Sequence, residues 1–236
     1  MTNLGVSGGL ACTGNGTLGI LVKHSSLPGR KLLLCCSHVV ARSGNFAVNF
    51  ESLFTAERIV QQPVPSDCDR SVNRIGLLIN SPAPFSVLKK GGETDGDFAL
   101  VLLDKEVSST ITPVQRITNN WIKHYLKENP ASWHGRTVRL LGALRRDEAD
   151  ALGRIVAMPE QGIDVDFSGV GVVRVKGAIE YEVKCEKGDS GGAVIDERNQ
   201  LLGLHIAGKP ANGTGVFLPV ADFMTKHALH LVERGS

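Results

Sequence analysis

The sequence predicts an all-β protein, and three features of its composition support this. Hydrophobic residues make up 42% of the 236 residues, whereas aromatic residues make up only 5%. Glycine is abundant, with 27 residues. The hydrophobic residues form many short runs separated by Gly, Pro and Asn, which is typical of strands joined by turns. A chain of this length can bury a full hydrophobic core.

The first half of the chain contains most of the clearest short apolar runs. Residues 118–128 differ, because they have helical spacing and a capping-type start, and Asn129-Pro130 follows them. We expect this segment to form a helix in the linker between the two halves. The expected strands of the first half cover residues 19–23, 31–36, 47–50, 59–64 and 98–103, with a weaker candidate at 77–79.

The second half begins near Gly135 and continues the same pattern of short apolar runs. Residues 220–232 have an amphipathic spacing that predicts a terminal helix. The expected strands of this half cover residues 137–141, 153–157, 172–175, 178–183, 193–195, 201–206 and 216–219.

The composition also excludes several classes of protein. A formal net charge of +2 argues against a dedicated nucleic-acid binder. No run approaches the roughly 18 apolar residues of a membrane span, and the start of the chain lacks the basic and apolar regions of a signal peptide. The five cysteines are an odd number, which favours reduced thiols and a cytoplasmic location. No Cys/His spacing indicates a zinc site, and we expect no cofactor.

One glycine-rich segment indicates nucleophilic catalysis. Gly188-Asp189-Ser190-Gly191-Gly192 precedes a short apolar run. Gly188 and Gly191 remove side chains where a substrate carbonyl would approach, and the amides of Gly188 and Ser190 could converge on one oxyanion. The alternative is a simple turn between two strands.

A serine nucleophile needs a base and an acidic partner that orients the base. Of the seven histidines, only His38 and His205 follow buried strand patterns, and His38 lies at the end of the run 31–36. Asp97 is the last acidic residue before the apolar run 98–103, so its side chain can be partly buried. Asp95 is the competing candidate for the acid.

The order His38, Asp97, Ser190 is the one found in chymotrypsin. Three motifs resemble those of compact bacterial trypsin/chymotrypsin-like serine proteases: the serine segment, Asp97-Phe98-Ala99-Leu100, and Cys36-Ser37-His38-Val39-Val40. Gly16-Thr17-Leu18-Gly19 resembles the opening strand of that family, and the likeness extends over roughly residues 9–232.

This resemblance implies two antiparallel six-stranded β-barrels with a C-terminal α-helix. Residues 1–117 would form the barrel that carries His38 and Asp97, and residues 118–135 a partly helical linker. Residues 136–236 would form the barrel that carries Ser190. By resemblance Ser190 attacks a polypeptide substrate, His38 transfers the proton, Asp97 fixes the His38 tautomer, and the amides of Gly188 and Ser190 form the oxyanion hole.

The resemblance also locates a specificity pocket. Lys184 lies six residues before Ser190, where trypsin has the acid that selects Lys or Arg, so cleavage after basic residues is not expected. The segment from Gly203 to Gly208 resembles a pattern in viral cysteine proteases of this fold, where the histidine reads Glu or Gln. His205 would do so here, with Cys185 and Gly208 lining the pocket. The alternative is that His205 is buried and bonded to its neighbours.

The sequence leaves the activation of this protein open. Relatives often pair a newly cleaved amino terminus with the aspartate before the serine, here Asp189, but no obvious processing site is present. Either Asp189 finds another partner, or an activating protein or domain assembles the oxyanion hole in a regulated protease. Two other functions stay open, namely a catalytically silent fold that serves as a binding or scaffold module and another acyl-transfer enzyme.

Overall fold

The computed structural model describes residues 5–8, 14–17, 19–40, 59–61, 74–80, 90–110, 130–141, 152–167, 170–186, 188–209 and 213–232. The expected strand at 47–50 and the expected helix at 118–128 lie outside these residues. None of the described helices is both long enough and apolar enough to cross a membrane.

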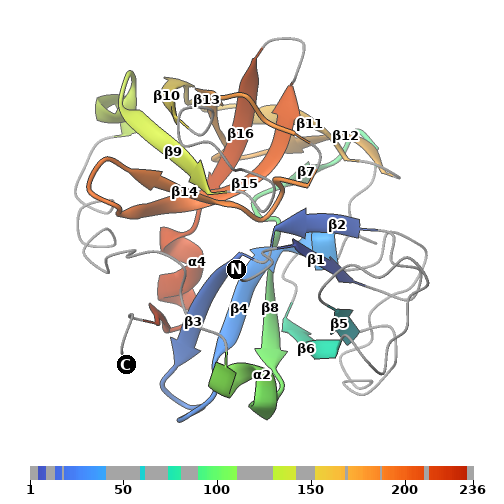
Figure 1. Ribbon diagram of the computed structural model, residues 1–236. Helices are drawn as coiled ribbons and strands as arrows, with labels where there is room; N and C mark the ends of the chain where they lie inside the picture. Colours follow the sequence, from blue (N-terminus) through green and yellow to red (C-terminus); the bar gives the residue numbers. More distant parts are fainter. Residues whose placement is uncertain are drawn as a thin grey trace.

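The second half forms a closed β-barrel, as the sequence predicts (Figure 1). Neighbouring strands are antiparallel all the way round, in the order β10-β13-β16-β15-β14-β9. Large buried side chains, including Trp133, Tyr181 and Phe217, form a core cluster with residues of this barrel. Its strands are β9 (Thr137–Leu141), β10 (Leu152–Ala157), β13 (Ile179–Glu182), β14 (Ala193–Asp196), β15 (Leu201–Lys209) and β16 (Thr214–Pro219).

Seven described strands of the first half, together with β17 from the end of the chain, form an eight-stranded sheet in the order β17-β3-β4-β8-β6-β5-β1-β2. Its central strands β4 and β8 are apolar runs that are almost wholly buried. The all-β class is therefore confirmed, and the domain boundaries at 117 and 135 stay a prediction. The strands are β1 (Gly5–Gly8), β2 (Gly14–Thr17), β3 (Ile20–His24), β4 (Leu32–Cys36), β5 (Ile59–Gln61), β6 (Arg74–Asn80), β8 (Phe98–Leu103) and β17 (Leu229–Leu231).

The end of the chain differs from the expected helix. A helix, α4, covers only Ala221–Lys226, and β17 follows and pairs with β3 of the first half. Ala228 has a φ of 47°, a left-handed conformation that breaks the helix between the two elements. The expectation of one helix over 220–232 was therefore wrong beyond Lys226. Three other short helical segments, α1 (Ser37–Val40), α2 (Lys105–Thr110) and the 3₁₀ helix η2 (Pro130–Trp133), complete the described helices.

A hairpin of the second half reaches the first half. Strands β11 (Ile163–Phe167) and β12 (Gly171–Val175) form the hairpin, and β12 pairs in parallel with β7 (Glu93–Thr94), just before Asp97. The side chains of β11 alternate between buried and exposed, as expected of a strand with one face on a core.

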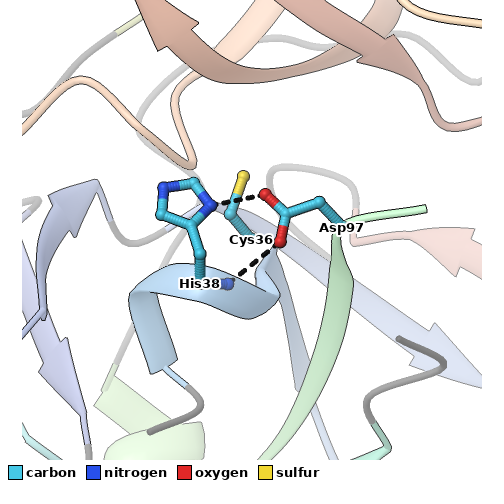
Figure 2. Close-up of side chains that lie close together, drawn as sticks. All are labelled: Cys36, His38 and Asp97. Carbon is cyan, nitrogen blue, oxygen red and sulfur yellow. Dashed lines mark hydrogen bonds and ion pairs between the residues drawn. The ribbon is translucent and has the colours of Figure 1, made fainter. Parts of the chain in front are cut away.

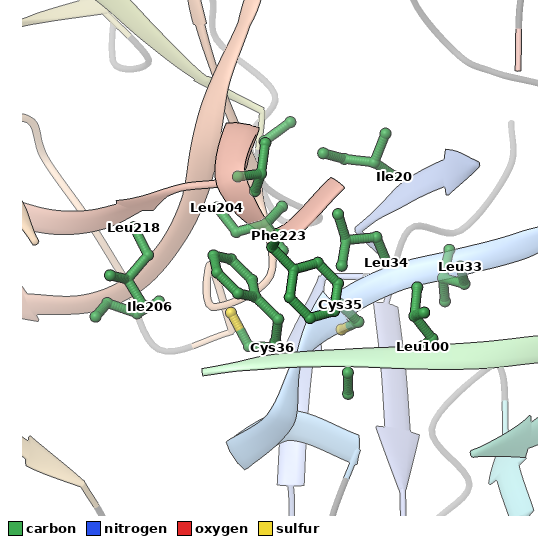
Figure 3. Packing of buried hydrophobic residues seen from close by; sticks show 14 of the residues in the cluster. Ile20, Leu33, Leu34, Cys35, Cys36, Leu100, Leu204, Ile206, Leu218 and Phe223 are labelled. Atoms are coloured by element: carbon green, nitrogen blue, oxygen red, sulfur yellow. The ribbon is translucent and has the colours of Figure 1, made fainter. Parts of the chain in front are cut away.

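The two halves also share one apolar core (Figure 3). Leu34 and Cys36 of β4 belong to the same buried cluster as Leu204 of β15, Leu218 of β16 and Phe223 of α4. The site that we describe next lies where the two halves meet.

Candidate active site

His38 and Asp97 form a hydrogen-bonded pair (Figure 2). His38 Nδ1 lies 2.5 Å from Asp97 Oδ2, and the backbone amide of His38 donates to Asp97 Oδ1 at 3.0 Å. The Asp97 side chain is fully buried, whereas that of His38 is 17% exposed. The buried carboxylate therefore orients the imidazole, and part of the His38 side chain stays exposed.

Local structure explains why these two residues meet. Strand β4 ends at Cys36, and one turn of helix, α1, then brings His38 to Asp97, which directly precedes the first residue of β8. Cys36 pairs with Phe98, directly after Asp97, and the amide of Ser37 donates to the carbonyl of Asp97 at 2.9 Å. The register of β4 and β8 thus fixes both partners. Asp95, the competing acid, is exposed.

Cys36 lies next to this pair, and ligand atoms of Cys36, His38 and Asp97 are all within 4.8 Å of one another. Burial, followed by the charges of Asp97 and Cys35, raises the pKa of the Cys36 thiol well above its usual value. A protonated thiol is a poor metal ligand, and both Asp97 oxygens already accept hydrogen bonds from His38. The chemistry therefore fits a proton-handling pair better than a metal site.

The cysteines of the described residues are free thiols, namely Cys35, Cys36 and Cys185. Burial raises the pKa of Cys35 to about 12. Cys36 Sγ donates to the carbonyl of His205 at 3.3 Å, and Cys35 Sγ donates to the carbonyl of Thr17 at 3.4 Å. These thiols are therefore buried structural groups. Cys12 and Cys68 lie outside the described residues.

The predicted nucleophile, Ser190, lies in the tight loop before β14. Gly188 and Gly191 have φ values of 108° and 91°, which only glycine adopts readily. The Ser190 hydroxyl donates to the carbonyl of Ile206 at 3.4 Å, a long hydrogen bond. Within the described residues, the amides of Gly188 and Ser190 have no hydrogen-bond acceptor.

Asp189 is held inside this loop. Its carboxylate is buried, and Oδ2 accepts a hydrogen bond from the amide of Glu186 at 2.8 Å. The amide of Asp189 donates to the carbonyl of Glu186, and the amide of Gly192 donates to the carbonyl of Asp189. The loop thus has an internal hydrogen-bond network around Asp189.

Hydrogen bonds join this loop to the first half of the chain. The amide of Thr17 donates to the carbonyl of Ser190 at 2.7 Å. The carbonyl of His205 accepts from both the amide of Gly191 and the thiol of Cys36. The loop of Ser190 is therefore bonded directly to Thr17 of β2, and the His205 carbonyl links it to β4, the strand that ends two residues before His38.

Among the predicted pocket residues, His205 is buried, with 1% of its surface exposed. Its Nδ1 lies 2.9 Å from the hydroxyl of Tyr181, whose ring meets that of His205 edge-on. Cys185 faces Gly208 so closely that a Cβ on Gly208 would lie 2.2 Å from Cys185 Sγ. Lys184, between the buried residues Val183 and Cys185, is exposed. The structure thus brings His205, Tyr181 and the Cys185–Gly208 contact into one half and turns Lys184 outward.

Three residues of this region were not predicted as site residues, although Thr17 lies in the segment that resembles the opening strand of the family. Thr17 contacts the serine loop, Tyr181 contacts His205, and the ring of Phe167 lies 5.3 Å from that of His38. The alternation of buried and exposed residues along β11 could have revealed Phe167 as an inward-facing residue. No local pattern predicts the partner of Thr17, because Ser190 is far away in the sequence.

Comparison with solved structures supports the fold. Thermobifida fusca Protease A has 17% sequence identity and a TM-score of 0.56, with 99% of this chain and 98% of that chain covered. Nocardiopsis protease has 17% identity and a TM-score of 0.54, with 98% and 97% covered. A glutamic acid-specific serine protease, described as using a histidine triad in substrate binding, has 13% identity and a TM-score of 0.55, with 98% of each chain covered.

A sequence comparison with curated proteins finds no match. The family model for trypsin matches residues 82–226, which is more than half of the chain and includes Asp97 and Ser190. The matching region, the closed barrel and the solved structures of the same fold agree with one another, and we conclude that this chain belongs to the trypsin family.

Proposed function

We propose that this protein is a serine endopeptidase that uses Ser190, His38 and Asp97. The hydrogen-bonded pair of His38 and the buried Asp97 carries this proposal, because it provides an oriented base at the junction with the Ser190 loop. Membership in the trypsin family supports the same reaction.

The reaction follows from the roles of these groups. Ser190 Oγ attacks the scissile carbonyl carbon, and its proton passes to His38 Nε2. The C–N bond then breaks, the amine leaves with the proton from His38, and the acyl group stays on Ser190 as an ester. Water hydrolyses this ester by the reverse proton path. The Ser190 hydroxyl donates to the Ile206 carbonyl in this structure and must first leave it, which rotation about the Cα–Cβ bond allows.

Charge stabilisation would come from the serine loop. The amides of Gly188 and Ser190, which lack acceptors within the described residues, would donate to the oxyanion of the tetrahedral intermediate. The bond between Asp189 and Glu186 supports a loop that assembles without a cleaved amino terminus. An activating partner is then not required for the chemistry, and the polypeptide substrate is the partner that the site needs.

The proposal includes a preference for Glu or Gln before the scissile bond. The Tyr181 hydroxyl lies 2.9 Å from Nδ1 of His205 and orients this imidazole within the half that carries Ser190, and an imidazole can form a hydrogen bond with a carboxamide or carboxylate. The fold-level likeness to a glutamic acid-specific protease with substrate-binding histidines supports this part. Because Lys184 is exposed, we assign the preference to His205 and expect a smaller contribution from Lys184.

A peptide series that varies only the residue before the scissile bond tests both parts. Peptides with Glu or Gln should be cleaved fastest, and the Ser190→Ala variant should cleave none of them. His205→Leu should lower kcat/KM for Glu and Gln peptides at least about tenfold, because the buried polar partner is lost. Lys184→Gln should change it less. Fastest cleavage after Lys, Arg or Phe would refute the preference and leave His205 as a structural histidine.

A further inference from the structure

Thr17, at the end of β2, contacts the serine loop from the other half of the chain. The residue is buried, with 2% of its surface exposed. Its amide donates to the carbonyl of Ser190 at 2.7 Å, and its hydroxyl donates to the carbonyl of Gly188 at 3.0 Å. Its own carbonyl accepts from the thiol of Cys35. Thr17 therefore joins β4 of the first half to the serine loop.

The two carbonyls that Thr17 holds belong to the two residues whose amides would bind the oxyanion. A carbonyl shares a rigid peptide plane with the amide of the next residue, and the two rotations φ and ψ connect it to the amide of its own residue. A fixed carbonyl therefore removes the freedom of one of the two peptide planes that meet at a residue. This matters most at Gly188, whose φ of 108° places it in a region where glycine rotates with little steric restraint. The hydroxyl of Thr17 supplies a restraint that the Gly188 backbone lacks.

The approach between the two segments is close. A Cβ on Gly191 would lie 2.4 Å from the Thr17 carbonyl oxygen and 3.2 Å from Cys35 Sγ. Glycine at 191 therefore lets the loop reach Thr17. The bond from the Thr17 amide needs only the backbone at position 17, whereas the bond to Gly188 needs a hydroxyl side chain there.

We propose that Thr17 is a positioning residue that orients the oxyanion hole through its side-chain hydrogen bond to Gly188. This inference rests on the proposed endopeptidase function for its effect on catalysis, but the effect on the loop itself does not depend on catalysis. Removal of the hydroxyl should loosen residues 188–192, slow the chemical step and leave substrate binding nearly unchanged.

The test compares the full chain with Thr17→Val, which keeps the side-chain shape and removes the hydroxyl. Hydrogen exchange is followed at the amides of Asp189, Gly191 and Gly192, which are hydrogen-bonded in the loop. These amides should exchange about tenfold faster in the variant. The rate of labelling by a fluorophosphonate, whose P=O group occupies the oxyanion hole, and kcat should each fall about tenfold, with KM within about twofold. Thr225→Val, at an exposed threonine of α4, is the matched control.

Two results would overturn the proposal: loop exchange in Thr17→Val equal to that of the wild type, or an equal rise throughout the barrel strands. If Thr17→Val does not fold, the pair Thr17→Ser and Thr17→Ala decides, because these variants differ by one hydroxyl. Slower exchange of the loop amides in Thr17→Ser than in Thr17→Ala supports the proposal, and equal exchange in the two variants refutes it. A wild-type protein that the probe does not label would refute the endopeptidase proposal, and loop exchange would still decide the role of Thr17.

Discussion

The two halves of this chain supply different parts of the site and differ in how they hold them. The second half is a closed barrel in which every strand is paired on both sides, and the Ser190 loop enters it before β14. The first half is an eight-stranded sheet whose outermost described strands are β17 and β2. His38 and Asp97 lie at the ends of its central strands β4 and β8. The proposed reaction therefore depends on contacts between the halves as well as on each half.

These contacts include specific hydrogen bonds and strand pairs beside the shared apolar core. Thr17 and Cys36 bond to the serine loop and to β15, and the β11–β12 hairpin pairs with β7. The hairpin also brings Phe167 to the ring of His38. The closed barrel therefore holds the loop of the proposed nucleophile, whereas the proposed base, His38, contacts residues from both halves. The following variants separate these contributions, starting from the largest expected effect.

Asp97→Asn should have the largest effect on activity. An amide in place of the buried carboxylate would favour the wrong tautomer of His38 and could not stabilise its protonated form, so kcat should fall on the order of 10⁴-fold. Asp95→Asn is the matched control, because Asp95 is two residues away and exposed. Steady-state kinetics on a peptide substrate measures both variants. Equal losses in the two variants would contradict the assignment of Asp97.

Gly191→Ala should have the largest effect on stability. Its Cβ would lie 2.4 Å from the Thr17 carbonyl oxygen, and its φ is 91°, so the free energy of unfolding should fall by about 3 kcal/mol or more. Gly177→Ala is the control, because Gly177 also has a positive φ of 67° but has nothing within 4 Å. The free energy of unfolding of Gly177→Ala should fall by about 1 kcal/mol only. Urea denaturation measures the difference, and equal losses would show that the contact between the halves contributes nothing.

Phe167→Leu tests the hairpin as a support for His38. The ring contact at 5.3 Å would be lost, and a less constrained imidazole should lower kcat by about tenfold. Val165→Ala, at a buried residue on the same face of β11, removes packing without touching His38. If Val165→Ala lowers kcat as much as Phe167→Leu at the same remaining stability, the hairpin acts through general stability only.

The smallest expected effect concerns pH and the junction of α4 with the first half. Burial, followed by the charges of Lys226 and His24, lowers the pKa of His227 below its usual value. The unfolded chain therefore takes up this proton first, so the free energy of unfolding should fall as the pH drops below about 6.5. His227→Gln should reduce this loss between pH 7.5 and 5.5 in thermal denaturation. An unchanged pH dependence would show that other groups cause it.

The strands differ in how well the sequence predicted them. Strands with continuous apolar runs, such as β4, β8 and β9, were predicted nearly residue by residue, because burial on both faces or strict alternation leaves a strong local signal. β17 was mistaken for part of a helix, because three residues are too few to establish a period of two after the amphipathic run that precedes them. Its partner, β3, lies at the other end of the chain.

In the candidate site too, local strand signals were predictable, whereas contacts between distant segments were not. The pairing of His38 with Asp97 was predicted, because each residue lies next to a strand with a strong apolar signal. The structure shows the hydrogen bonds between them. The contacts of Thr17 and Phe167 could not be predicted, since they join residues that meet only after the two halves pack. Tyr181 lies within a predicted strand, but nothing local indicates that its hydroxyl faces His205.

The most direct test of the central claim is to label the full chain with a fluorophosphonate and to locate the adduct by mass spectrometry. The proposed function predicts one adduct per chain, on Ser190, with none in Ser190→Ala and a labelling rate in Asp97→Asn at least about a thousandfold lower. An unlabelled wild-type protein, or an adduct on another residue, would contradict the claim that His38 and Asp97 of one half activate Ser190 of the other.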